Sequence, residues 1–79
     1  MKDKFYVISA FAMNSEERRK DCVDNAEEYV AMLDEAIAKN EKGRYDGRFD
    51  TYEEAIDFVE RTNFPFSYVI IWNGMVLLM

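Results

Sequence analysis

The chain has 79 residues, enough for one domain, residues 1–79, and it carries 16 acidic residues, 10 basic residues, one cysteine and no histidine. The net charge of −6 disfavours direct binding of nucleic acid, because phosphate contacts need clustered lysine and arginine. Without histidine the chain lacks the commonest catalytic base and metal ligand, so we expect a non-enzymatic protein without a cofactor.

The first predicted element is a strand from Lys4 to about Met13. Its residues are apolar on both sides of the alternating pattern, which is typical of an inner strand. The charged start before it contains Asp3, and no cleavage site follows, so the pattern is not that of a signal peptide. We therefore expect a soluble, cytoplasmic protein.

A long helix follows from Ser15, and Lys39 and Lys42 suit its C-terminus. Its apolar residues recur at helical spacing: Cys22, Val23, Ala26, Tyr29, Val30, Leu33, Ala36 and Ile37. Because this stripe begins only at Cys22, the first two turns either project beyond the core or form a loop with Asp21 as the helix cap. We favour the projecting helix, with Gly43 in the left-handed position after its end. Cys22 is expected to be a core residue.

Residues 44–49 predict a short strand or, alternatively, a tight turn at Asp46-Gly47. Thr51 and Glu54 have the spacing of a capping box, which opens a second helix that continues to about Thr62. Its apolar side is expected to be buried: Tyr52, Ala55, Ile56 and Val59, with Phe58 on the flank.

The C-terminal segment predicts a β-hairpin, because YVIIW and MVLLM flank Asn73-Gly74. Both turn residues tolerate the positive φ of a type I′ turn. In that register Trp72 opposes Met75, Ile71 opposes Val76, and Ile70 opposes Leu77. The uncharged residues 62–79 are not a membrane span, because Asn63, Pro65 and the turn interrupt them.

These elements predict an α+β fold with the order β-α-β-α-β-β. We expect two layers, a four-stranded mixed or antiparallel sheet with both helices on one face. The pattern leaves the strand order open.

An acidic surface is the first candidate site. Between Asp21 and Ala38 the chain has six acidic residues and no basic residue. Helices on one sheet face would join their acidic sides into one surface for a basic partner protein: Glu17, Asp21, Asp24, Glu28, Glu35, Glu53, Asp57 and Glu60. The alternative is an ordinary solvated helix face. A third interpretation places a metal or acid–base pair at Asp21, Asp24 and Glu28.

The second candidate is one face of the hairpin: Tyr68, Ile70, Trp72, Met75 and Leu77. Both hairpin faces are apolar, and two helices on one side of the sheet leave the other side bare. The compact β-branched face suits the helices. The aromatic face then needs the N-terminal segment, a second copy of the chain or a partner as its cover.

The leading hypothesis is a small acidic protein-interaction module, an inhibitor or modulator that binds a basic surface of another protein, a class that includes nucleic-acid-binding grooves. In general character it is similar to the small inhibitors that phages and mobile elements encode, anti-CRISPR proteins among them. The second hypothesis is a homodimeric structural or regulatory domain. The third is a carboxylate-based metal binder or enzyme.

Overall fold

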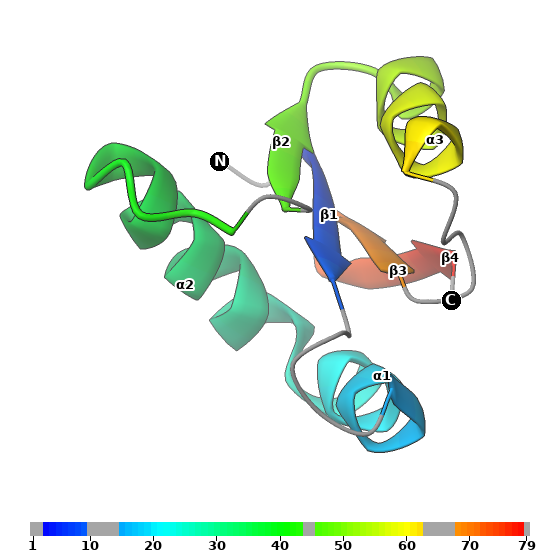
Figure 1. Cartoon of the computed structure of the whole chain (residues 1–79). Helices are drawn as coiled ribbons and strands as arrows, with labels where there is room; N and C mark the ends of the chain where they lie inside the picture. The colour runs from blue at the N-terminus through cyan, green and yellow to red at the C-terminus, as the bar shows by residue number, and fades with distance from the viewer. Residues whose placement is uncertain (1–2, 10–14, 44–45, 63–67, 79) are drawn as a thin grey trace.

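The computed structural model describes residues 3–9, 15–43, 46–62 and 68–78. It contains one antiparallel sheet with the strand order β2-β1-β3-β4 (Figure 1). The strands are β1 (Phe5–Ser9), β2 (Gly47–Phe49), β3 (Tyr68–Trp72) and β4 (Met75–Leu78). The helices are α1 (Ser15–Asp24), α2 (Ala26–Ala38) and α3 (Tyr52–Arg61). The α+β class and the four-stranded sheet are confirmed. None of these three helices has the length and apolar run that a membrane span needs.

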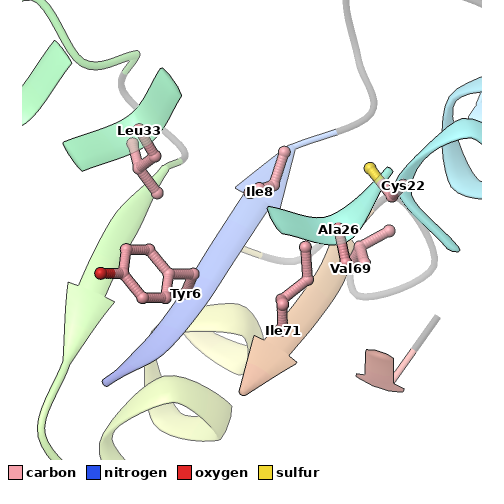
Figure 2. Close-up of a cluster of buried hydrophobic side chains, with 7 residues drawn as sticks. All are labelled: Tyr6, Ile8, Cys22, Ala26, Leu33, Val69 and Ile71. Atoms are coloured by element: carbon pink, nitrogen blue, oxygen red, sulfur yellow. The ribbon is translucent and has the colours of Figure 1, made fainter. Parts of the chain in front are cut away.

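The helices lie on both faces of the sheet, so the molecule has three layers rather than two (Figure 1). One core joins α1 and α2 to the sheet, and Figure 2 shows its side chains: Tyr6, Ile8, Cys22, Ala26, Leu33, Val69 and Ile71. The other joins α3 to the opposite face: Val7, Ala55, Val59, Tyr68 and Ile70. The prediction that both helices share one face is therefore wrong for α3.

The alternation within β1 explains the three layers. Tyr6 and Ile8 point toward α1 and α2, while Val7 points toward α3, and all three are buried. The strand pairs with β2 on one side and β3 on the other, so the predicted inner strand is confirmed. Residues 10–13 of the predicted strand lie outside the described residues.

The long predicted helix begins at Ser15 as expected, but it breaks at Asn25. Asn25 has φ −130° and ψ 41°, and α2 leaves α1 in a different direction (Figure 1). A straight helix over residues 15–38 would be about 36 Å long, whereas the molecule extends 26 × 25 × 23 Å. The break lets both Cys22 and Ala26 enter the core. The predicted straight, projecting helix is therefore wrong.

The end of α2 is stabilised by Asn40 rather than by Gly43. Asn40 adopts the left-handed conformation, with φ 57°, and its N–H donates to the carbonyl of Ile37 at 3.1 Å. The next N–H, that of Glu41, donates to the carbonyl of Ala36 at 2.7 Å. These two bonds form the Schellman motif, in which asparagine is a common substitute for glycine.

The start of α3 follows its sequence signature. The backbone N–H of Glu54 donates to Thr51 Oγ1 at 3.2 Å, and that hydroxyl donates to Glu54 Oε1 at 3.0 Å. Ala55 and Val59 are buried as predicted, whereas Tyr52 is 39% exposed and lies at the margin of the core. Residues 44–45 lie outside the described residues, and β2 begins only at Gly47.

The hairpin turn is also as predicted, because Asn73 and Gly74 both have positive φ, 53° and 79°. The register differs at one position. Trp72 opposes Met75 and Ile71 opposes Val76, but Ile70 opposes Leu78. Leu77 is therefore the extra residue of a β-bulge in the edge strand.

Candidate functional site

The α1–α2 junction gathers two carboxylates of the predicted acidic surface, Asp24 and Glu28, and a third, Glu27, that the prediction did not include. Asp24 ends α1, and Glu27 and Glu28 lie in the first turn of α2. All three side chains are exposed. Within the described part of the chain, no basic side chain forms an ion pair with Asp24 or Glu28. Their negative charge therefore faces solvent without a partner from the described residues.

A hollow of about 380 Å³ lies at this junction, lined by residues 23–28 and by Gly74 of the hairpin turn. Three of the residues that line it are acidic, namely Asp24, Glu27 and Glu28. Val23 also lines it, and this side chain is 49% exposed although it belongs to the predicted apolar stripe. The break at Asn25 explains why Val23 is exposed, because it turns α1 away from the axis of α2. We name this hollow the acidic hollow.

Asp21 has a different role from its acidic neighbours. Its carboxylate accepts hydrogen bonds from Tyr29 Oη at 2.6 Å and from Asn25 Nδ2 at 3.0 Å. These bonds join α1 to the first turns of α2 across the break. Asp21 therefore holds the junction in shape.

The remaining acidic candidates do not form one surface. Glu35 pairs with Lys39 at 2.8 Å on α2, and Asp57 pairs with Arg61 at 2.7 Å on α3. Glu53, Asp57 and Glu60 are exposed, but they belong to the helix on the opposite face of the sheet. Glu17 is exposed on α1. The predicted continuous surface over both helices is thus wrong in its geometry, because the sheet separates its two parts.

The second candidate site is also divided. Tyr68 and Ile70 are fully buried in the core beneath α3. Trp72 is half-buried, while Met75 is 51% and Leu77 is 40% exposed. Only the hairpin-tip part of the predicted apolar face is therefore open to another molecule.

A polar network lies at the margin of the α1–α2 core, and the sequence patterns did not predict it. Tyr6 Oη donates to Asp34 at 2.8 Å, and Arg48 Nη1 on β2 pairs with Asp34 Oδ1 at 2.6 Å. Figure 2 shows the Tyr6 hydroxyl pointing toward the β2 side of the core. Burial and then the bond to Asp34 raise the pKa of Tyr6 to about 12. The Asp34 carboxylate raises the pKa of Arg48.

This network borders a second groove, of about 260 Å³, between α2 and the hairpin turn. Glu27, Val30, Ala31 and Asp34 line its helix side at the i, i+3, i+4, i+7 spacing of one helix stripe. Glu27 and Gly74 line both this groove and the acidic hollow, so the two depressions adjoin at the turn.

The acidic residues of the hollow line a depression without converging as the ligands of one metal ion do. Among the described residues, no group of three acidic or cysteine side chains converges as a metal site would require. The lone Cys22 is buried, as predicted. The chain matches no family model, no curated protein and no solved structure.

Proposed function

We propose that the protein is a non-enzymatic interaction module that binds a basic surface of another protein through the acidic hollow. The observation that carries this proposal is the hollow itself, a 380 Å³ depression lined by Asp24, Glu27 and Glu28. The hollow is large enough to admit the end of a lysine or arginine side chain, a group with which carboxylates form charge-assisted hydrogen bonds. Val23 adds an apolar wall for the methylene stem of that side chain.

The distribution of ion pairs supports the same site. Some exposed acidic side chains elsewhere are paired with neighbouring bases, as Glu35 is with Lys39 and Asp57 is with Arg61. Asp50 is paired with Lys4, which lowers the pKa of that carboxyl. No basic side chain of the described residues neutralises Asp24 or Glu28, and these two carboxylates, unlike the equally unpaired Glu53 and Glu60 of α3, belong to residues that line the acidic hollow.

An inhibitor of a nucleic-acid-binding protein fits this chemistry, because such proteins carry basic grooves. The net charge of −6 favours a contact with part of a groove rather than an imitation of a whole duplex. Electrostatic steering would make association fast and sensitive to salt.

The test is charge reversal with a matched control on the other face of the sheet. Asp24→Lys with Glu28→Lys changes the hollow, and Glu53→Lys with Glu60→Lys makes the same change in charge on α3. A partner is captured from host lysate, identified by mass spectrometry and purified, and its affinity for each variant is measured at two salt concentrations. We expect the first pair to weaken binding at least tenfold and to flatten the salt dependence.

The control separates a local site from a general effect of charge. If the α3 pair weakens binding as much as the junction pair, only net charge matters and the acidic hollow is not the site. If neither pair changes the affinity, the proposed function is wrong.

A further inference from the structure

A row of large apolar side chains crosses the whole sheet beside the hairpin tip. Phe49 opposes Phe5, Phe5 opposes Trp72, and Trp72 opposes Met75, so each of the four strands contributes one residue. The rings of Phe5 and Trp72 stack with centroids 5.6 Å apart and planes 12° apart. Tyr52 of α3 contacts Phe5 edge to face at 6.0 Å.

The row is covered at one end and open at the other. Phe49 packs against Phe58 of α3, with ring centroids 5.1 Å apart. At the opposite end Met75 is half exposed, and Trp72 is only partly buried. We name Trp72, Met75, Leu77 and Tyr52 the tip patch.

The tip patch and the acidic hollow meet at the hairpin turn. Asn73 and Gly74 connect Trp72 to Met75, and Gly74 also lines the acidic hollow. The Glu27 carboxylate lies beside the turn, because a Cβ on Gly74 would be 3.5 Å from Glu27 Oε1. One two-residue turn therefore has an aromatic and thioether surface on one side and carboxylates on the other.

The exposed area helps to decide what covers the tip patch. Met75, Leu77 and Tyr52 are 51%, 40% and 39% exposed. At about 200 Å² for a large side chain, they expose on the order of 250 Å² in total. A stable interface buries about 800 Å² on each partner, so the patch alone is too small for a stable dimer.

Charge and strand geometry also weigh against a second copy. Two copies that met at the hairpin tip would bring their acidic hollows toward each other, and like charges oppose such a contact. Pairing of two β4 edges is opposed by the bulge at Leu77, because bulges are one way in which sheets block edge-to-edge addition. A partner with basic residues around an apolar centre meets neither obstacle.

We propose that the hairpin tip is the centre of the docking surface, and that the partner is a basic protein whose apolar residues cover Trp72 and Met75 while its lysine or arginine enters the acidic hollow. This inference rests on the proposed function and adds the apolar half of the contact. It follows the usual anatomy of an interface, in which a tryptophan-centred core is surrounded by a charged rim.

Two synthetic peptides of equal charge serve as probes. One is acetyl-Lys-Arg-Gly-Gly-Arg-Lys-amide, and the other has Leu-Phe in place of Gly-Gly. Each is titrated into the chain labelled with ¹⁵N and with ¹³C at its methionine methyl groups, and the Trp72 indole and Met75 methyl signals are followed beside the amides of Asp24 and Glu28. We expect the Leu-Phe peptide to bind at least tenfold more tightly and to shift both sets of signals, and the Gly-Gly peptide to shift the hollow alone.

The variants assign this difference to the patch. Met75→Glu removes the advantage of the Leu-Phe peptide, so that the two peptides of equal charge bind with nearly equal affinity. Met32→Glu is the matched control, because Met32 is a 62% exposed methionine on α2 that lines neither the acidic hollow nor the groove beside it. It leaves the preference for the Leu-Phe peptide intact.

Each contrary result has a distinct meaning. Equal affinity of the two peptides, with shifts at the hollow only, overturns this inference and leaves the proposed function standing. Salt-insensitive binding at Trp72 and Met75 alone overturns both. Shifts of the Trp72 signal that depend on protein concentration, without peptide, show that a second copy covers the patch and overturn the inference. No binding of either peptide at millimolar concentration also overturns it.

Discussion

The two faces of the sheet are both apolar, but their covers differ in extent. The face that carries Val69 and Ile71 is covered by α1 and α2, whose break at Asn25 lets them follow the sheet in two directions. The opposite face carries Val7, Tyr68 and Ile70 and is covered by α3, a helix of ten residues. A single helix is about 10 Å wide, and neighbouring strands lie about 4.8 Å apart. One helix therefore covers about two strands fully.

The consequence of this difference is the open hairpin tip. α3 packs on β1 and β2, and it buries Tyr68 and Ile70 on β3 but not Met75 on β4. On the other face, the helix pair brings its own acidic junction to the same turn. The short helix α3 on one face leaves apolar side chains of the hairpin tip exposed. The break between α1 and α2 on the other face places carboxylates beside the same tip.

The largest expected effect tests whether the sheet has two buried faces. Ile70 and Ile71 are adjacent, are both fully buried and belong to opposite cores. We expect Ile70→Ala and Ile71→Ala each to lower the free energy of unfolding by about 2–5 kcal/mol. Urea unfolding followed by the fluorescence of Trp72, the only tryptophan, measures both changes.

A two-layer sheet would give a different result, because Ile70 would then face solvent. A loss below about 1 kcal/mol for Ile70→Ala, beside a large loss for Ile71→Ala, contradicts the three-layer arrangement. If either alanine variant is unfolded from the start, Ile70→Val and Ile71→Val allow the same comparison at about 0.5–1.5 kcal/mol each.

The fold was predictable where local chemistry decides it. The cap at Thr51 and the turn at Asn73-Gly74 depend on residues that are neighbours in the chain, and both formed as predicted. The side on which α3 packs does not follow from its amphipathic pattern, since that pattern fits either apolar face. The informative signal was β1, whose apolar residues on both sides require a cover on both faces.

The next largest expected effect is on the pH dependence of the free energy of unfolding, through Tyr6 at the edge of the α1–α2 core. The pKa of Tyr6 is raised from 10.0 to about 12, first by burial and then by the bond to Asp34. Because this pKa is higher in the folded than in the unfolded chain, the stabilisation is present below about pH 10 and is lost as the pH rises toward 12. A shift of this size corresponds to a contribution on the order of 1–3 kcal/mol.

Tyr6→Phe isolates that contribution. Between pH 8 and pH 11, we expect the wild type to lose more unfolding free energy than Tyr6→Phe does. At neutral pH the variant costs about 1 kcal/mol, because Asp34 keeps its ion pair with Arg48. Tyr52→Phe, at an exposed tyrosine, is the control and retains the wild-type loss. Equal losses in wild type and Tyr6→Phe would mean that the network does not stabilise the fold.

The candidate sites were less predictable than the fold, for a physical reason. The role of Asp34 does not follow from the acidic pattern of its helix, because its partner Arg48 lies on β2. One signal was available, since a tyrosine on the aliphatic side of an inner strand needs a partner for its hydroxyl. The acidic hollow depends on the break at Asn25 and on the nearby hairpin turn, and neither follows from the spacing of the acids.

The smallest expected effect concerns the N-terminal ends of α2 and α3, which pack on opposite faces of the sheet. The Thr51 hydroxyl accepts the N–H of Glu54 at the start of α3, whereas Asn25 makes no side-chain cap bond to α2. The Asn25 amide instead donates to Asp21 on the surface at 3.0 Å. We expect Thr51→Ala to cost about 1 kcal/mol, because it leaves one N–H of the first turn without its partner. Asn25→Ala should cost no more than about 0.5 kcal/mol.

Thr51→Ser decides whether the cap itself accounts for that cost. Serine keeps the accepting oxygen, so we expect its unfolding free energy in urea to stay within a few tenths of a kcal/mol of wild type. A serine variant as unstable as Thr51→Ala would show that the threonine methyl, and not the hydrogen bond, stabilises the start of α3. Among the described helices α3 is the one that covers its face, so this capping bond supports the layer next to the tip patch. The break at Asn25 is instead accompanied by the packing of Cys22 and Ala26 in the other core.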